Sequence, residues 1–282
     1  MSKPSFAFLL LIAASATAQV ASQPEMPLTA EAIMARVAAN QDASEKLRSQ
    51  YVYHQRIHVA SLKTNGKLLR EETTEYHVVP QADSTNKILR GLTGRYLHKG
   101  KYLDYSSEEA PDSDSLDADL VRDLRDDLAK DNTKDSLGRD LFPLTSAEQQ
   151  KYKFRLLGRQ KLQGRDVYRI GFEPKHKGDV IWKGETLIDV AEFQPVNIYT
   201  KPAHGVPLVV RTMLGSNLPG IGFNVQYQRQ PDGVWFPSTF GTEFRLHILF
   251  FLNREVTMSL ENTAFEHTHV DSRMIGVVGP VQ

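Results

Sequence analysis

The strongest constraint on the fold is a strict two-residue alternation of apolar and polar side chains in the last third of the chain. In residues 243–250, phenylalanine, leucine and isoleucine occupy every second position, with charged residues or histidine between most of them. Residues 223–228 and 256–260 alternate in the same way. Successive side chains of a β-strand point to opposite faces, so each segment predicts a strand with one apolar face. Such a sheet has to cover its apolar face by curling, by docking helices or by holding an apolar ligand.

Turn residues divide the chain from about 152 to 266 into short strands. Clusters of glycine, proline and asparagine separate the apolar runs, which is typical of antiparallel hairpins. The strands predicted there are 154–158, 167–172, 186–188, 197–200, 208–214, 223–228, 235–237, 242–252 and 256–260. Earlier strands are predicted at 51–59, 76–79, 88–89, 96–97 and 102–103, with a hairpin turn at Asn65-Gly66. Strands and helices do not alternate, which disfavours a parallel α/β sheet.

Two segments have the spacing of amphipathic helices instead. In residues 29–49 apolar side chains fall at i, i+3, i+4, i+7 and i+8, and Thr29 is a candidate N-cap. The second helix, 116–130, lies in an acidic segment, residues 104–140, that contains 13 acidic and 5 basic residues. Its apolar stripe consists of Leu116, Leu120, Val121, Leu124 and Leu128, and we expect this stripe to dock while the charged remainder faces water. A capping box at 145–148 predicts a third, short helix.

The first 18 residues have the organisation of a secretory signal peptide. A positive charge precedes the apolar run 6–14, and Ala16 and Ala18 place small residues before a cleavage site. The run is too short to span a bilayer, which takes about 20 residues. We expect cleavage after Ala18 and a soluble mature protein in the periplasm or outside the cell.

The composition excludes several classes of protein. Without cysteine, the chain has no disulfides, thiol catalysis, iron–sulfur cluster or zinc–thiolate site. The formal net charge is zero and no basic stripe is evident, which argues against a nucleic-acid partner. No apolar run after residue 18 approaches the length of a membrane-spanning helix. The length suits one large β domain or two small ones.

The nine histidines do not indicate a catalytic or metal site. The densest group, Glu266-His267-Thr268-His269 followed by Asp271, lies near the C-terminus, where exposed tails are common. His54 and His58 lie on the polar side of a predicted strand, as surface residues do. A Gly-x-Ser-x-Gly nucleophile elbow is absent, and the acidic residues are too numerous to single out a catalytic carboxylate pair. We therefore predict no catalytic residue, no metal site and no cofactor.

Three short motifs and the order of the elements resemble a known superfamily. The motifs are Gln163-Gly164-Arg165-Asp166-Val167-Tyr168-Arg169-Ile170-Gly171-Phe172, then 184–189 followed by Pro195, and finally 231–237. The first is similar to the Gly-x-x-x-Tyr-x-Ile/Leu strand of the outer-membrane lipoprotein carrier proteins and their relatives, the LolA/RseB-like superfamily. The others resemble the next hairpin and a late hairpin of these proteins. The order of elements is the stronger signal and covers most of residues 29–266.

The resemblance implies a mainly β (α+β) fold, in which a curved antiparallel sheet forms an unclosed half-barrel with a few helices covering its concave face. The mature chain would be one such domain, residues 19–282, with an acidic helical insertion at about 104–140. Members of the superfamily bind or sense the acyl chains of lipoproteins in the apolar cavity. The resemblance therefore implies a periplasmic binding or carrier protein for a lipid, an acyl chain or a lipoprotein, with peripheral membrane contact and no catalysis.

The candidate cavity is formed by the apolar side of the late strands. Its residues are Phe223, Val225, Tyr227, Phe244, Leu246, Ile248, Phe250, Val256, Met258 and Leu260. An outer-membrane β-barrel and a secreted hydrolase are the alternative functions. The charged helix at 116–130 and a C-terminus that does not end in an aromatic strand argue against the barrel. Histidine and carboxylate abundance alone supports the hydrolase.

Overall fold

The computed structural model describes residues 28–80, 85–106, 115–130, 142–176, 182–202, 222–248 and 252–268. Within these residues the chain forms three helices and eleven strands. The helices are α1 (Ala30–Arg48), α2 (Leu116–Lys130) and α3 (Ser146–Gln149). The strands are β1 (Tyr51–Leu62), β2 (Leu68–Pro80), β3 (Thr85–His98), β4 (Lys101–Tyr105), β5 (Tyr152–Leu162), β6 (Arg165–Pro174), β7 (Trp182–Asp189), β8 (Pro195–Pro202), β9 (Phe223–Arg229), β10 (Trp235–Ile248) and β11 (Leu252–His267).

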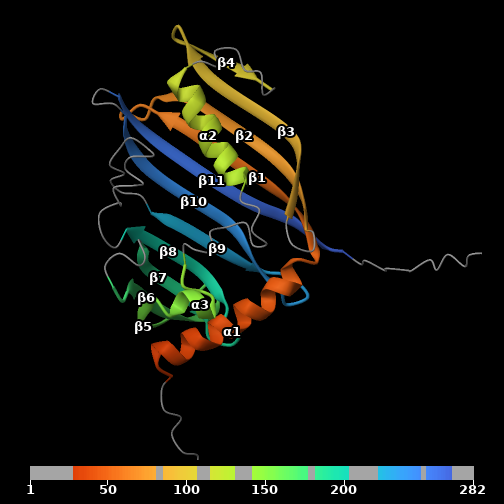
Figure 1. Ribbon diagram of the computed structural model, residues 1–282, viewed down its shortest axis with the longest axis vertical. Coiled ribbons are helices and arrows are strands. Elements are labelled where there is room, and N and C mark those ends of the chain that lie inside the picture. The colour runs from red at the N-terminus through yellow and green to blue at the C-terminus, as the bar shows by residue number, and fades with distance from the viewer. Residues whose placement is uncertain are drawn as a thin grey trace, which may run out of the picture.

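All eleven strands pair in one antiparallel sheet, in the order β4-β3-β2-β1-β11-β10-β9-β8-β7-β6-β5. Most neighbours in the sheet are also neighbours in sequence. The exception is the pair β1–β11, which joins the first part of the chain to the last at the centre of the sheet. The edge strands β4 and β5 lie at opposite ends, so the described sheet is not closed into a barrel (Figure 1). The predicted mainly β fold, with one open antiparallel sheet and few helices, is confirmed.

Buried side chains line up across the strands on one face of the sheet. The register links one residue of each strand from β3 to β6 in a row: Leu92, Thr74, Ile57, Leu260, Phe240, Val225, Ile198, Thr186 and Ile170. All of them are buried, and only two are not hydrocarbon side chains. We call this side the apolar face and the other side, which carries His58, Glu185 and Asn224, the polar face. The alternation in sequence predicted this two-sided sheet.

The helix α1 closes one end of the apolar face (Figure 1). Its N-cap is Thr29, whose Oγ1 accepts a hydrogen bond at 3.2 Å from the backbone N–H three residues later. The predicted apolar residues are all buried: Ala30, Ile33, Met34, Val37 and Ala38. On the next turns Asn40 donates to the Glu192 carbonyl at 2.8 Å, and Arg48 donates to the Trp235 carbonyl at 3.3 Å. These bonds fasten α1 to the β7–β8 turn and to the start of β10.

The helix α2 spans the predicted residues 116–130 and lies over β1 and β2 (Figure 1). Ala118 and Val121 are fully buried, whereas Leu116 is 37% exposed, so its place in the docking stripe was wrong. Leu116 is the first residue of the helix, whereas Leu120, Leu124 and Leu128 farther along are partly buried against the core. The parts of the acidic segment at 107–114 and 131–141 lie outside the described residues.

The predicted cap of α3 and the predicted turn at Asn65-Gly66 are confirmed. Thr145 caps α3 by accepting the Glu148 N–H at 3.3 Å. In the β1–β2 hairpin Gly66 adopts φ +78°, which glycine tolerates without a steric penalty, and the Asn65 side chain accepts the N–H of Lys67 at 3.2 Å. Hydrogen bonds between residues close in sequence form both the cap and the turn, so the sequence was sufficient to predict them.

Two strands each join segments that the sequence predicted as separate. The separate segments 88–89 and 96–97 are parts of one strand, β3, and the segments 235–237 and 242–252 merge largely into β10. Both strands continue through residues that are poor strand formers, such as Gly94 and Gly241, because each strand pairs with a neighbour on both sides there. At Gly94 the missing side chain leaves space for the Tyr105 ring, because a Cβ there would lie 2.1 Å from that ring.

Candidate functional site

The predicted cavity residues lie on three adjacent strands, β9, β10 and β11, in the middle of the apolar face. Buried in the common core are Phe223, Val225, Phe244, Val256 and Leu260, and partly buried against it are Tyr227 and Met258. For Leu246 and Ile248 the described part is the backbone, which pairs with Arg254 and Leu252. Phe250 lies outside the described residues.

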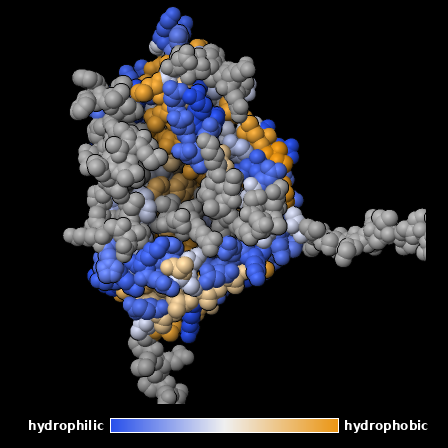
Figure 2. Space-filling model, in the orientation of Figure 1, coloured by the Kyte–Doolittle hydropathy of each residue, from blue (hydrophilic) through white to orange (hydrophobic). Residues whose placement is uncertain are grey.

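Cross-strand pairing brings these side chains into one surface. Phe240 stands opposite Leu260 on β11 and Val225 on β9, and its ring centroid lies 5.2 Å from that of Phe223. Figure 2 shows apolar residues gathered in a hollow of this face, below α2. Phe240 was not among the predicted residues. It has the same parity as Phe244, so extending the alternation by four residues would have found it.

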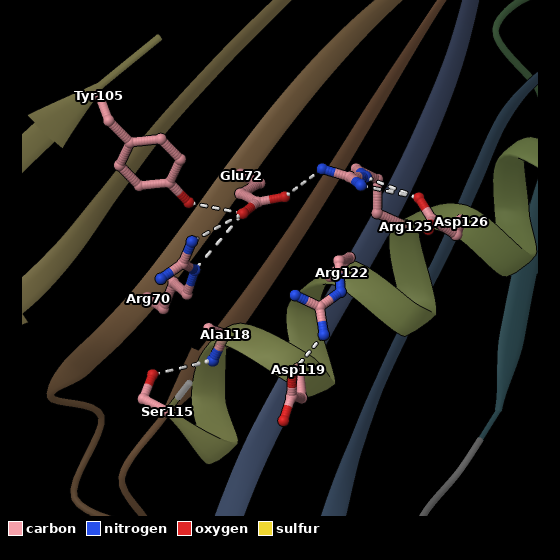
Figure 3. Close-up of polar contacts among 9 residues, drawn as sticks. All are labelled: Arg70, Glu72, Tyr105, Ser115, Ala118, Asp119, Arg122, Arg125 and Asp126. Atoms are coloured by element: carbon pink, nitrogen blue, oxygen red, sulfur yellow. Dashed lines mark hydrogen bonds and ion pairs between the residues drawn. The ribbon is translucent and has the colours of Figure 1, made fainter. Parts of the chain in front are cut away.

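A buried charged cluster lies between α2 and the apolar face (Figure 3). The Glu72 carboxylate, on β2, is only 4% exposed and has three donors. They are Arg125 of α2 at 2.8 Å, Arg70 of β2 at 3.1 Å and the Tyr105 hydroxyl of β4 at 2.6 Å. Removing a carboxylate from water costs several kcal/mol unless partners compensate. One carboxylate therefore holds a helix and two strands together.

The surroundings fix the protonation states in this cluster. Burial is the main cause that raises the pKa of Tyr105 above its ordinary value of 10.0, and the hydrogen bond to Glu72 and the charge of Glu72 add to it. Burial by itself lowers the pKa of Arg125, but the hydrogen bond to Asp126 and the charge of Glu72 outweigh it, so this pKa is raised. At neutral pH a neutral phenol and a charged guanidinium face the carboxylate.

Arg70 is held mainly by rings rather than by a second carboxylate. Its guanidinium carbon lies 4.8 Å from the ring centroid of Tyr105 and 5.8 Å from that of Tyr96. Such contacts stabilise a buried cation by about 2 kcal/mol. The Arg70 Nη1 atom is buried and has no hydrogen-bond partner among the described residues. The cluster therefore holds one more donor than it uses.

A second polar contact fixes the N-terminal end of α2. Asp117 accepts from Arg254 of β11 at 2.7 Å and 3.0 Å, and from the Ser61 hydroxyl of β1 at 2.6 Å. A paired arginine–carboxylate contact with two bonds is among the strong hydrogen bonds. The helix is therefore fastened to the sheet by ions at Asp117 and Arg125, and Val121 together with Leu120, Leu124 and Leu128 packs against the core.

Neither of these contacts was predicted from the sequence. Arg125 and Asp117 were counted with the charged, solvent-facing side of the helix. Glu72 nevertheless shares its strand parity with Tyr76 and the fully buried Val78, which is a signal for the buried face. A charged residue at such a position is rarely buried without a partner, so the pattern could have indicated that one exists.

The histidines do not form a site within the described residues. The His267 ring lies 3.1 Å from the Gln50 side chain on the surface, and His58 pairs with Glu71 at 3.2 Å. His269 and Asp271 lie outside the described part of the chain. Among the described residues no three histidine, aspartate or glutamate side chains are grouped so that they could hold a metal ion.

Comparisons with known proteins give structural matches only. No family model matches the chain, and no curated protein matches it in sequence. The match to a LolA superfamily protein from Nitrosomonas europaea covers 86% of this chain and 94% of that protein, with 10% identity and a TM-score of 0.35. A DUF1329 family protein from Desulfovibrio piger covers the same shares, with 11% identity and a TM-score of 0.38. A chain of the Pseudomonas aeruginosa MucA/MucB complex covers 80% of this chain over 94% of its own, with 11% identity and a TM-score of 0.23.

The Nitrosomonas europaea protein among these matches belongs to the superfamily that the motifs and the order of elements resemble. The matches concern the fold, and the function is argued below from this chain's own residues. No described helix is both long and apolar enough to cross a lipid bilayer.

Proposed function

We propose that this protein is a periplasmic binding or carrier protein for a lipid or for the acyl chain of a lipoprotein, and that it catalyses no reaction. The observation that carries the proposal is the apolar row across nine strands of an open sheet, overlaid in part by a helix that ion pairs at Asp117 and Arg125 fasten to the sheet. A sheet whose apolar face runs this far offers an extended surface to an alkyl chain, at about 25 cal/mol for each Å² of apolar surface removed from water.

The charged contacts between α2 and the sheet support a ligand beneath this helix rather than a permanent core. In the helix Arg125, Asp117 and Asp126 are charged, and the sheet meets the first two with Glu72 and Arg254. Replacing a buried ion pair by apolar residues is often neutral or stabilising, so ions are a poor way to fix a permanent core. Charged contacts regain hydration when they separate, and a helix held by them leaves the sheet at a lower cost than one held by apolar packing alone. This polar attachment fits a cover that is displaced by a ligand.

The N-terminal pattern at residues 1–18 supports the proposed location, because a protein exported with a cleaved signal peptide works outside the cytoplasm. Secretion also fits a chain without cysteine, whose length makes disulfides unnecessary. Peripheral contact with a membrane follows from the need to load and release an apolar ligand.

The direct test is native mass spectrometry of the full chain purified without detergent after export. We expect additional mass from a co-purified lipid, and we expect a fluorescent fatty acid to bind after delipidation. Protein that carries no lipid and takes up no probe would contradict the proposal.

A matched pair of variants locates the binding surface. Met258 is partly buried on the apolar face of β11, and its neighbour Ser259 is exposed on the polar face. Met258→Asp should abolish probe binding, because an unpaired carboxylate in an apolar site costs several kcal/mol. Ser259→Asp adds the same charge on the other side and should bind normally. Equal binding by the two variants, both folded by circular dichroism, would place the ligand elsewhere.

A further inference from the structure

The polar face of the sheet pairs its arginines with carboxylates across neighbouring strands. Arg169 of β6 donates to Glu185 of β7 at 2.8 Å. Arg245 contacts Glu255 at 3.0 Å, and Arg95 contacts Asp104 at 2.6 Å. Opposite charges placed directly across a strand pair stabilise a sheet, whereas like charges destabilise it. Cross-strand ion pairs are thus a repeated feature of this face.

One corner of the polar face departs from this pattern. Lys183 of β7 and Lys201 of β8 are direct cross-strand partners. Lys153 and Arg155 of β5 lie in the same corner, and none of these four cations has a carboxylate within ion-pair distance among the described residues. Glu173 is the direct cross-strand partner of Lys153 but makes no ion pair among the described residues, and Glu185 is engaged by Arg169. Positive charge therefore exceeds the negative charge available to it.

The same corner contains a cavity. Its volume is about 520 Å³, and it is lined by all three lysines together with Tyr199, whose side chain is half exposed. Gly171 forms part of the wall, and the nearest heavy atom to a Cβ placed there is a methyl carbon of Leu157 at 3.4 Å. Packing thus leaves room for a side chain at Gly171. A glycine inside a strand is less stable than alanine and often marks a place where a ligand approaches the backbone.

We propose that this cavity is a binding site for a phosphate group, with Lys153, Lys183 and Lys201 as its cationic ligands and Tyr199 as the wall against which the rest of the ligand lies. Lysine is a flexible point charge and a common partner of phosphate. A phosphate carries up to two charges on three oxygens and so contacts three ammonium groups at once, which a carboxylate with two oxygens does not. Binding also relieves the repulsion between the two cross-strand lysines.

The site is separate from the proposed lipid-binding surface. Lys183 and Lys201 alternate along their strands with Thr186 and Ile198, which belong to the row on the apolar face. The two sites therefore lie on opposite sides of the sheet, and the phosphate site does not depend on the proposed function.

The test uses the full chain, inorganic phosphate and thermal unfolding at constant ionic strength set with chloride. Phosphate that binds the folded state raises the Tm by mass action. We expect this rise in the wild type, and we expect it to fall to less than half in Lys183→Gln/Lys201→Gln. The matched control is Lys63→Gln/Lys67→Gln in the β1–β2 hairpin, which removes two exposed lysines away from the cavity and should keep the full rise. An equal rise in all three proteins would overturn the proposal.

Two further variants separate phosphate binding at this site from a nonspecific effect of net charge or a loss of stability. Lys153→Gln removes one ligand without altering the cross-strand pair and should also lower the rise, whereas Lys183→Arg/Lys201→Arg should retain most of it. Without phosphate, Lys183→Gln should unfold at the wild-type temperature or above it, because it removes a like-charge contact. A Tm well below wild type in that variant, with no loss of the phosphate effect, would show that these lysines are structural.

Two experiments distinguish a lipid headgroup from a soluble phosphate ester as the source of the phosphate group. Co-sedimentation with vesicles of phosphatidylcholine containing phosphatidic acid, whose headgroup is a phosphate monoester, compared with phosphatidylcholine alone, reports binding of a lipid headgroup. Displacement of the protein from such vesicles by glycerol 1-phosphate, or binding of glycerol 1-phosphate alone, reports a soluble phosphate ester. Either result supports the site when it is lost in Lys183→Gln/Lys201→Gln, and the absence of both contradicts it.

Discussion

The Arg125 guanidinium of α2 donates to the Glu72 carboxylate of β2 at 2.8 Å, and both side chains are buried. The two residues are 53 positions apart in sequence, and their contact joins the acidic helix to the sheet. Removing one partner of a buried pair leaves an uncompensated charge, at a cost of about 3–5 kcal/mol. Arg125→Ala should therefore lower the free energy of unfolding by an amount of that order, measured by urea denaturation.

The matched control for this prediction lies on the same helix. Arg122 is exposed and pairs with Asp119 on the outer side of α2, so Arg122→Ala should change the free energy of unfolding by less than about 1 kcal/mol. Similar losses for the two variants would show that the buried contact is no stronger than a surface pair.

Alkaline pH should reveal the buried hydroxyl of Tyr105. The pKa of Tyr105 is raised in the folded state, mainly by burial, so folding favours the neutral phenol. This contribution to stability is fully present below the unfolded-state value of 10.0 and is lost as the pH rises beyond it. The free energy of unfolding should fall more steeply above pH 10.0 in the wild type than in Tyr105→Phe. Parallel pH profiles from denaturant titrations of the two proteins would contradict this assignment.

The histidines near the C-terminus should be dispensable for folding. His267 is exposed, lies near the Gln50 side chain and packs edge-on against the Tyr51 ring, and His269 lies outside the described residues. Replacing both by alanine should change the free energy of unfolding by no more than about 0.5 kcal/mol, as surface substitutions generally do. Thermal unfolding with and without a chelator measures this. A larger loss, or a bound metal that disappears with the two side chains, would show that a metal site exists there.

The signal peptide should be removed after Ala18. The small side chains of Ala16 and Ala18 behind an apolar run form the cleavage pattern. N-terminal sequencing of the exported protein should begin at Gln19. A sequence that starts at Met1 or Ser2 would refute the prediction and remove one support for a periplasmic location.

The sequence by itself determined which residues form strands and helices and which of their sides are apolar. The alternation around Phe244, the spacing of α1 from Ala30 and the cap at Thr29 depend on neighbours within a few residues, so local patterns are sufficient to predict them. The same information placed Val225 and Leu260 on a common apolar side, because parity along a strand fixes the side of the sheet to which each residue points.

Tertiary structure alone decided which strands pair and which distant residues contact each other. The pairing of β1 with β11 depends on strands about 200 residues apart, and nothing local specifies such a partner. Arg125 was expected on the water-facing side of its helix, and only the docking of α2 on the sheet pairs it with Glu72. Lys183 and Lys201 become neighbours through the β7–β8 register. The physical reason is that the free energy of a charge depends on the dielectric and the partners around it, and these are supplied by residues distant in sequence.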